Sequence, residues 1–500
     1  MDVIEGNTIA RTVHKLTDVV VVGTGPAGAA AARTIAKAGL GVILVDEGPY
    51  VEPSQFPKDG FSAMAQMYRD MGASLSRGAP MMPLVQGRVV GGTSVVNGAI
   101  SWRLPRDVHD EWVQADPALA DALPWETLDS LFDQIETDLD IRPTEADIAG
   151  ANNLLLKKGA DALGIENRPI SRNVRGCRGL GRCLQGCPEG RKNSMDRTYL
   201  PDACRDGAEL YSEVRIDRVV VENGRAIGVC GRAAGGGKVN IAAGKAVVLA
   251  ASAIQTPALL QRSRIRGGPV GEGFQCHPGA SVSGRFADSV RLWTGATQGH
   301  EAIGLRKQGI KFEALGYDMS LVATRLKSVG SQLSRDIEDM MHHAHWGAAI
   351  RARARGRVRA SRTGTSVKFS LTPEDMRLVR RGVSVLGQML LAAGADYVEP
   401  GVHGWKARVT DRADMERFDA EGPLDPRAYM MAVTHMFGTC AMGSDPAKSV
   451  VRHDFRHQHT RNLYIADSSV FPSNTGVNPQ TSIIALATMC GQRIVEAAMR

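Results

Sequence analysis

The sequence has 500 residues, too many for one ordinary hydrophobic core, which predicts about two to four domains. Its 43% hydrophobic and 23% charged residues exclude a largely disordered chain, and no apolar run reaches the roughly 18 residues that cross a bilayer. The formal net charge of +7 is mild and gives no reason to expect nucleic acid as a partner. Because the first residues are mixed and charged, without the apolar stretch of a secretory signal, we expect a cytoplasmic protein with no membrane span.

The first predicted unit is a strand, a helix and a second strand within residues 18–48. A β-branched run at 19–22 predicts a buried strand, an Ala-rich segment at 29–38 predicts a helix, and 42–45 predicts another buried strand. Between the first strand and the helix, glycines have G-x-G-x-x-G spacing: Gly23, Gly25 and Gly28. This order is typical of a dinucleotide-binding βαβ unit.

Each of these glycines has a physical role in such a unit. The first allows the tight turn, the second lets a pyrophosphate approach the backbone, and the third lets the helix pack close to the strand. The helix N-terminus then offers amide donors to the phosphates. Asp46, after the second strand, is the predicted ribose ligand, and Glu47 is the alternative. The pattern predicts adenine-dinucleotide binding without separating FAD from NAD.

The segment GRVVGGTSVVNGAISWRLP, residues 87–105, indicates which of the two dinucleotides, FAD or NAD, is bound. Paired glycines let backbone approach a planar ring, and small hydroxyls can satisfy phosphate oxygens. The segment resembles the Gly-Gly-Thr/Ser-Ser…Asn-Gly motif that follows the FAD fingerprint in the glucose–methanol–choline (GMC) oxidoreductase family. The resemblance implies FAD as cofactor. It also implies contacts with the FAD diphosphate and flavin from Gly91, Gly92, Thr93, Ser94, Asn97 and Gly98.

Three cysteines crowd together next, as Cys177-x5-Cys183-x3-Cys187-Pro. Closely packed thiolates can hold an iron–sulfur cluster, and the spacing resembles the three-cysteine segment of bacterial membrane-linked FAD sugar dehydrogenases with a three-iron cluster. The pattern that follows, with Lys192-x-Ser194, resembles instead the Cys/Gly-rich loops of other branches of the family. We favour a structural loop and predict no metal. Zinc, with Cys204 as fourth ligand, or a disulfide is the third alternative.

The middle of the chain shows a hairpin and a second family signature. A two-residue Asn223-Gly224 turn joins two apolar runs, which predicts a β-hairpin. The resemblance implies that Val214 holds the adenine through its backbone. A buried strand at 247–250 leads into a turn and an amphipathic helix that resemble the second signature of the family, although Ser252 stands where the family usually has glycine. Residues 271–279 resemble the link towards the substrate domain.

Residues 286–430 carry no fixed catalytic motif. The alternation and then helical periodicity at 367–394 predict an antiparallel sheet backed by helices. Three neighbouring histidines are interpreted as polar residues over a site or at the surface rather than as metal ligands: His342, His343 and His345. Five arginines alternate and are expected on one solvated strand face, an anion or partner surface being the alternative: Arg351, Arg353, Arg355, Arg357 and Arg359.

The carboxyl end contains the predicted chemistry. The segments THMFGTCAMG, from Thr434, and NLYIADSSVFPSNTGVNPQ, from Asn462, resemble the most diagnostic region of the family, His-x-x-Gly-Thr-x-x-Met-Gly followed by Asn-Pro. The resemblance implies that His435 and Asn478 are the paired catalytic residues. It also implies FAD contacts from Asp467 and Pro479.

Alcohol oxidation gives these two residues defined tasks. An alcohol gives up hydride readily only when its O–H proton is drawn away. His435, with an ordinary pKa near ~6.5, is predicted as the general base, and the Asn478 amide is predicted to position the oxygen and stabilise its developing charge. The hydride then passes to flavin N5.

The resemblance implies an α/β plus α+β fold: a Rossmann-like FAD-binding domain with an antiparallel-sheet substrate domain. We assign 15–105, 196–285 and 431–500 to the former and 106–195 and 286–430 to the latter. The expected function is FAD-dependent oxidation of an alcohol on a sugar, amino-sugar or polyol, by analogy with aminoglycoside-pathway alcohol oxidases, with oxygen or an electron-acceptor partner. Alternatives are a three-iron-cluster sugar dehydrogenase, a flavin-dependent lyase, a flavin monooxygenase and a non-catalytic flavin module. The oligomeric state stays open.

Overall fold

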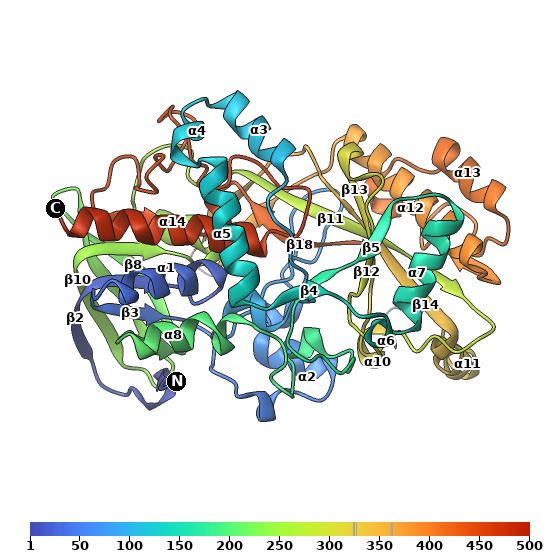
Figure 1. Ribbon diagram of the computed structural model, residues 1–500, viewed down its shortest axis with the longest axis horizontal. Coiled ribbons are helices and arrows are strands. Elements are labelled where there is room, and N and C mark those ends of the chain that lie inside the picture. The colour runs from blue at the N-terminus through green and yellow to red at the C-terminus, as the bar shows by residue number, and fades with distance from the viewer. Residues whose placement is uncertain (324–325, 327, 362–363) are drawn as a thin grey trace.

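The computed structural model describes residues 1–323, 326, 328–361 and 364–500, and two large sheets organise them (Figure 1). The first has eight strands in the order β1-β7-β3-β2-β10-β9-β8, with β19 paired to β10. Their bounds are β1 (Ile4–Glu5), β2 (Val13–Val22), β3 (Val42–Val45), β7 (Glu209–Ser212), β8 (Val214–Glu222), β9 (Arg225–Ala233), β10 (Lys238–Leu249) and β19 (Leu463–Ile465).

The parallel centre of this sheet contains the predicted βαβ unit. Strand β2 pairs in parallel with β3 and β10, and its last four residues, all valine, are buried. Helix α1 (Pro26–Lys37) connects β2 to β3 and packs against α14 (Gln480–Ala498) and α8 (Tyr199–Arg205), so that three helices lie together over this sheet (Figure 1). Parallel strands need cover on both faces, which explains the unbroken apolar runs. The sequence prediction is confirmed here.

The predicted hairpin is also confirmed. Strands β8 and β9 pair antiparallel, with Glu222 opposite Arg225. The two residues between them, Asn223 and Gly224, both have positive φ, 48° and 70°. Asparagine and glycine tolerate this left-handed conformation, which a two-residue turn needs to match the twist of the strands.

The second sheet has nine strands in the order β16-β15-β11-β14-β13-β12-β5, with β17 and β18 also paired to β11. Their bounds are β5 (Asn167–Pro169), β11 (Glu272–Arg285), β12 (His300–Ala302), β13 (Ile310–Ala314), β14 (His343–Ile350), β15 (Gly356–Ala360), β16 (Thr365–Lys368), β17 (Tyr397–Glu399) and β18 (Met431–Phe437). A separate ribbon pairs β4 (Ile141–Pro143) with β6 (Ser171–Asn173). All pairings in the second sheet are antiparallel, as expected for the substrate half.

Two segments that we expected in the FAD-binding half, one of them the long strand β11, belong to the nine-stranded sheet. We grouped 272–285 and 431–437 with the FAD-binding segments, but both form strands of the nine-stranded sheet and lie between the two halves of the molecule (Figure 1). Conversely, Trp112 and Phe132, from the segment assigned to the substrate domain, pack into the core of the eight-stranded sheet. Family motifs mark residues near the cofactor, whereas sheet membership follows strand pairing. The division into domains stays a prediction.

Helices cover both sheets. The longest, α12 (Pro373–Ala393), packs on β11 and β14 and is capped by Thr372, whose side chain accepts from the Asp375 N–H. This confirms the helix expected after the alternating segment. The others are α2 (Gly60–Met67), α3 (Arg106–Ala115), α4 (Leu119–Ala122), α5 (Trp125–Asp138), α6 (Ala146–Ala149), α7 (Ala151–Ala162), α9 (Ser252–Arg262), α10 (Met319–Ala323), α11 (Ser331–Asp339) and α13 (Arg412–Glu421). None of the described helices combines the length and apolar composition that a membrane crossing requires.

The arginine stripe does not form one strand face, so that prediction is wrong in part. Only Arg357 and Arg359 lie in β15, and residues 351–355 are outside any strand. Buried residues still alternate with exposed arginines along this segment, and the partly exposed Arg351 forms a two-bond ion pair with Glu111. Arg359 pairs with Glu272 on β11.

Candidate active site

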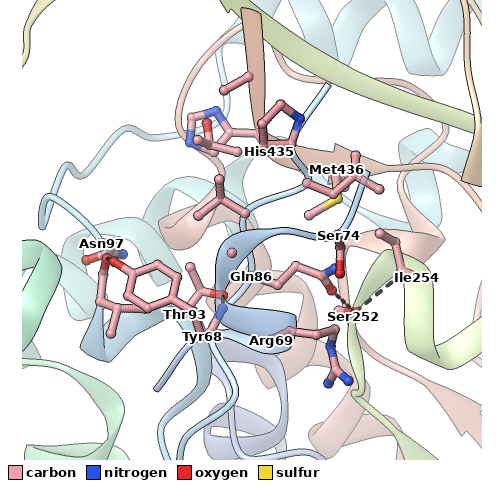
Figure 2. Close-up of a pocket in the computed structure, with 18 of the residues that line it drawn as sticks. Tyr68, Arg69, Ser74, Gln86, Thr93, Asn97, Ser252, Ile254, His435 and Met436 are labelled. Carbon is pink, nitrogen blue, oxygen red and sulfur yellow. Dashed lines mark hydrogen bonds between the residues drawn. The ribbon is translucent and has the colours of Figure 1, made fainter. Parts of the chain in front are cut away.

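A cavity of about 1760 Å³ runs between the two sheets. Its walls come from the turn after β2, the segment 83–98, the start of β8, and strands β11, β13 and β18. Figure 2 shows the part of this cavity between His435 and Met436 at one end and Arg69 and Ser252 at the other.

The turn after β2 leaves room for a dinucleotide. A Cβ on Gly28 would lie 1.8 Å from Gly23 O, so only glycine lets α1 pack this close to the strand. A Cβ on Gly25 would meet only Gly92 Cα, at 3.8 Å, so this position is open towards the cavity. Helix α1 begins here without a side-chain cap, which leaves its first N–H groups available for phosphate. These features fit the FAD diphosphate.

Asp46, the predicted ribose ligand, lines the cavity, and its carboxylate is hydrogen-bonded within the protein. Its carboxylate accepts from Thr24 N and Oγ1, at 3.0 and 2.6 Å, and from Gly48 N at 2.8 Å. Burial raises its pKa above the ordinary value. The alternative ribose ligand, Glu47, forms an ion pair with Arg69. The ribose contact itself stays a prediction.

Most other predicted cofactor residues line the same cavity. They are Gly23, Gly25, Asp46, Gly92, Thr93, Ser94, Asn97, Gly98, Val214, Asp467 and Pro479. Gly28 and Gly91, also predicted, do not line the cavity. The Gly91 N–H donates to Thr24 Oγ1 at 3.0 Å. The Val214 N–H donates to Asp46 O at 2.8 Å, so this group is not open to adenine.

The two predicted catalytic residues meet in the cavity although they are far apart in the sequence. His435 belongs to β18 and Asn478 lies just before α14, and His435 Nε2 is 3.4 Å from Asn478 Nδ2. Burial, and next the nearby charge of Lys311, lower the pKa of His435 to about 3. The imidazole is therefore neutral at neutral pH.

Sequence reasoning missed a third imidazole beside this pair. His277 Nδ1 lies 3.1 Å from His435 Nδ1, and His277 Nε2 accepts from the Gly476 N–H at 2.9 Å. His277 sits where the β11–β18 register shifts, between Cys276 and Pro278, and such irregularities re-aim side chains next to sites. The sequence signal of this segment, 271–279, is its resemblance to the link towards the substrate domain, which indicates no catalytic role for His277.

A buried lysine was also missed. Lys311 Nζ donates to Asn478 Oδ1 at 2.7 Å and pairs with Glu301, at 2.7 Å, and with Glu313. Lys311 and Glu313 are two residues apart on β13, so their side chains lie on the same face of the sheet. Glu301, on the neighbouring strand β12, lies directly opposite Glu313. Charged residues two apart within a buried strand pattern are the signal that could have found them.

The three clustered cysteines line a separate small cavity. The guanidinium of Arg172 donates to Cys183 Sγ at 3.3 Å and lies 3.8 Å from Cys177 Sγ, while Cys187 Sγ accepts from the Arg191 N–H. Burial by itself raises the pKa of Cys183, but the charges of Arg172 and Lys192 outweigh it, and the pKa lies below its ordinary value.

Within the described part of the chain, no three His, Cys, Asp or Glu side chains gather as a metal site. This holds for the cysteine loop and for the neighbouring histidines. Among the latter, His343 Nδ1 lies 3.0 Å from Ser283 Oγ, and His342 Nδ1 donates to Asp288 O at 3.2 Å. The role of the cysteine loop stays a prediction.

Comparison with known proteins agrees with this geometry. Two sequence profiles of the family described as GMC oxidoreductase match residues 64–279 and 352–487. The chain is 34% identical to an uncharacterized GMC-type oxidoreductase of Mycobacterium tuberculosis, over 96% of this chain and 76% of that protein. The chain belongs to the GMC oxidoreductase family. It is therefore an FAD-dependent oxidoreductase that acts on CH–OH groups.

More distant relatives share most of the chain. The long-chain-alcohol oxidase FAO4A of Arabidopsis thaliana is 26% identical over 98% of this chain and 70% of its own length. Among solved structures, pyridoxine 4-oxidase from Mesorbium loti superposes with a TM-score of 0.72 at 17% identity, over 95% of this chain and 98% of that one. The structural likeness confirms the expected fold.

Proposed function

We propose that this enzyme oxidises an alcohol whose hydroxyl group is carried on a large apolar body, such as a long aliphatic chain. The observation that supports this substrate class is the rim of the cavity. Five large apolar side chains both line the cavity and are between 44% and 69% exposed: Phe61, Met71, Leu75, Met81 and Met430. Exposed apolar side chains gathered at the mouth of a site indicate a ligand that covers them.

The alcohol group of such a substrate would reach His435 and Asn478 at the inner end of the cavity. Bound FAD supplies the hydride acceptor. The two side chains hold the hydroxyl oxygen, and the Asn478 N–H stabilises negative charge that develops there. The long-chain-alcohol oxidase among the relatives supports the same substrate class.

A sugar, amino-sugar or polyol, as expected from the sequence, is the second candidate. It is favoured by Gln298 and Glu313, which line the cavity and are joined by a hydrogen bond of 2.7 Å. An amide and a carboxylate could accept substrate hydroxyls or an ammonium group. Because Gln298 and Glu313 already bond to each other, they are less available to a substrate, and the apolar rim is the stronger argument for the substrate class.

Anaerobic reduction of the yellow holoenzyme tests the proposal. We would mix it with 1-dodecanol or with glucose and glucosamine, and follow bleaching of the visible flavin band. Bleaching by the apolar alcohol at lower concentration than by the sugars is expected; the reverse order contradicts the apolar class. Readmission of air then separates an oxidase, which recolours at once, from a dehydrogenase that needs another acceptor.

Two variants sharpen this test. Met81→Ser removes an exposed apolar side chain at the rim of the cavity. It should raise KM for the apolar alcohol several-fold, while kcat for that alcohol and both constants for the sugars stay unchanged. Leu16→Ser is the control, because Leu16 is 78% exposed on β2 and does not line the cavity. A protein that binds FAD but is bleached by no alcohol would favour the lyase or the non-catalytic module.

A further inference from the structure

The small cavity beside the clustered cysteines is strongly positive. Its volume of about 20 Å³ holds about one water molecule. Three free thiols and four arginines line it: Cys177, Cys183, Cys187, Arg172, Arg178, Arg182 and Arg191. Glu189 lines it too, but already pairs with Arg178, at 3.0 Å, and with Arg191, at 3.7 Å. The thiols are therefore the groups that can still compensate the positive charge here.

Arg172 is a buried cation whose guanidinium contacts only sulfur among the described residues. It is 1% exposed. One of its nitrogens donates to Cys183 Sγ at 3.3 Å, a second donates to Cys177 Sγ at 3.8 Å, and Nε has no hydrogen-bond partner. Arginine keeps its charge in proteins, and a buried charge is costly unless it is paired. A thiolate at Cys183, the closer sulfur, supplies the missing negative charge.

The electrostatics and the access of Cys183 agree with a reactive thiolate. Burial by itself raises the pKa of Cys183, but the charges of Arg172 and Lys192 hold it below its ordinary value. The thiolate is the nucleophilic form of cysteine. Because Cys183 is only 9% exposed, a reagent reaches its sulfur through the small cavity, which favours one little larger than water. Hydrogen peroxide is an oxidant of that size.

We propose that Cys183 is an oxidation site at which hydrogen peroxide forms a sulfenic acid, which Cys177 then converts to a disulfide. In the first step the Cys183 thiolate attacks one peroxide oxygen, the O–O bond breaks, hydroxide leaves, and the sulfur is oxidised by two electrons. In the second step the Cys177 sulfur attacks the Cys183 sulfur, an S–S bond forms, and water leaves. Cys177 is the partner because it contacts the same guanidinium, whereas Cys187 Sγ accepts from the Arg191 N–H.

The backbone around Cys183 is tied to the wall of the large cavity that fits FAD. Lys192, only 2% exposed, donates from Nζ to Cys183 O at 2.8 Å and to Asn97 O at 3.0 Å. The Tyr68 hydroxyl donates to Leu184 O at 2.6 Å. Asn97 and Leu184 both line the large cavity, and Asn97 is one of the predicted FAD contacts. A displacement of Cys183 therefore acts on the segment that faces the cofactor.

Oxidation changes the charge at this point. A disulfide is neutral, so it leaves the buried Arg172 without its counter-charge, and the loop has to rearrange to compensate that cation. Lys192 and Tyr68 transmit the rearrangement to the wall of the large cavity. The oxidised enzyme consequently binds FAD less tightly than the reduced enzyme. This inference does not depend on which alcohol the enzyme oxidises.

Peptide mass spectrometry after differential alkylation locates the oxidised thiols. Holoenzyme that has been reduced and freed of reductant is treated with increasing hydrogen peroxide. We expect a Cys177–Cys183 disulfide at several-fold less peroxide than oxidises Cys230, a partly exposed thiol outside the loop. In Cys177→Ser, dimedone should label Cys183 as a sulfenic acid. A Cys183–Cys187 bond, oxidation of Cys183 no faster than that of Cys230, or stoichiometric iron or zinc on the thiols would overturn the proposal.

Variants of Arg172 test the source of the reactivity. Arg172→Met should slow the oxidation of Cys183 several-fold, whereas Arg172→Lys keeps the charge and should stay close to the wild type. Arg178→Met is the control, because the side chain of Arg178 is 67% exposed and pairs with Glu189. If Arg172→Met does not fold, the dimedone label in Cys177→Ser decides alone. Equal rates in Arg172→Met and the wild type would overturn the role of Arg172.

Release of FAD measures the coupling without any alcohol. Oxidised and reduced holoenzyme, both freed of peroxide with catalase, are diluted and filtered, and the flavin fluorescence of the filtrates is compared. The oxidised wild type should release FAD several-fold faster, and dithiothreitol should restore slow release. Cys183→Ser should release FAD equally with and without peroxide, while Cys230→Ser should follow the wild type. Equal release from oxidised and reduced wild type would overturn the coupling to the cofactor.

Discussion

Lys311 Nζ lies 2.7 Å from Asn478 Oδ1, which joins a charged cluster of the nine-stranded sheet to the residue that precedes helix α14. Glu301 and Glu313 are directly opposite each other on β12 and β13, where like charges repel. Lys311 contacts both, and Arg168 pairs with Glu301 from outside at 2.9 Å. The active-site amide is thus held by a buried ion cluster.

Removal of the lysine charge should destabilise the fold. Lys311→Met leaves a buried carboxylate at Glu313 without its cation, and breaking a buried pair costs about 3–5 kcal/mol. Urea unfolding of the holoenzyme measures this loss. The double variant Lys311→Met, Glu313→Gln should recover part of it because the uncompensated charge is gone. Lys307→Met, on the surface, should stay within about 0.5 kcal/mol of the wild type; an equally small effect at Lys311 would contradict the account.

The two inner glycines of the dinucleotide turn should behave differently when changed to alanine. In Gly28→Ala the new Cβ meets Gly23 O at 1.8 Å, so we expect an insoluble or strongly destabilised protein. In Gly25→Ala the protein side is open, so the chain should fold with near-native circular dichroism but lose its yellow colour. Gly244→Ala is the control, since its Cβ has only ordinary contacts. Retained FAD in Gly25→Ala would show that the diphosphate lies elsewhere.

The dinucleotide turn and the His435–Asn478 pair were predictable from sequence because short-range spacing and family motifs encode them. His277 and Lys311 were not, because what each contacts depends on the pairing of its strand with another strand. The position of His277 depends on a register shift between β11 and β18. The charge of Lys311 is compensated both by Glu313 on its own strand and by Glu301, which β12 brings beside it. The positions of these two residues are therefore determined by pairing between strands that are far apart in the sequence, which local sequence patterns do not reveal. The same reason explains why the sequence did not predict that 272–285 and 431–437 pair as strands of the nine-stranded sheet.

Ser252, the first residue of α9, has a strained backbone conformation. Its φ is +90°, a region that favours glycine, and the sequence pattern already indicated glycine as usual there. Ser252→Gly should raise the free energy of unfolding by about 1 kcal/mol. Ser252→Ala keeps the strain and loses the hydroxyl contact with Gln86, visible in Figure 2, so it should lower stability. Equal effects of the two substitutions in thermal unfolding would contradict the strain argument.

The Cys183 thiol in the cysteine loop should ionise more readily than it would without Arg172, and we expect no metal cluster there. Arg172 lowers the pKa of Cys183 against the effect of burial, so Arg172→Met should slow alkylation of Cys183 by iodoacetamide at pH 7.5 several-fold, as read by peptide mass spectrometry. Cys204, which does not contact Arg172, gives the reference rate in the same sample. Stoichiometric iron and absorption beyond the flavin bands in protein purified without air would contradict this expectation and favour the cluster.

Acid should destabilise the enzyme partly through its buried histidines. The folded pKa of His435, about 3, lies below its ordinary 6.5, because of burial and then Lys311. Between these values the unfolded chain binds more protons, so the stability that the neutral ring allows is complete above pH 6.5 and is lost as pH falls towards the folded pKa. From pH 7 to pH 4 this one ring contributes a loss of roughly 3 kcal/mol. Urea unfolding at several pH values should therefore give a shallower acid loss in His435→Gln than in the wild type, with His14→Gln following the wild type; parallel curves for all three proteins would show that His435 titrates normally.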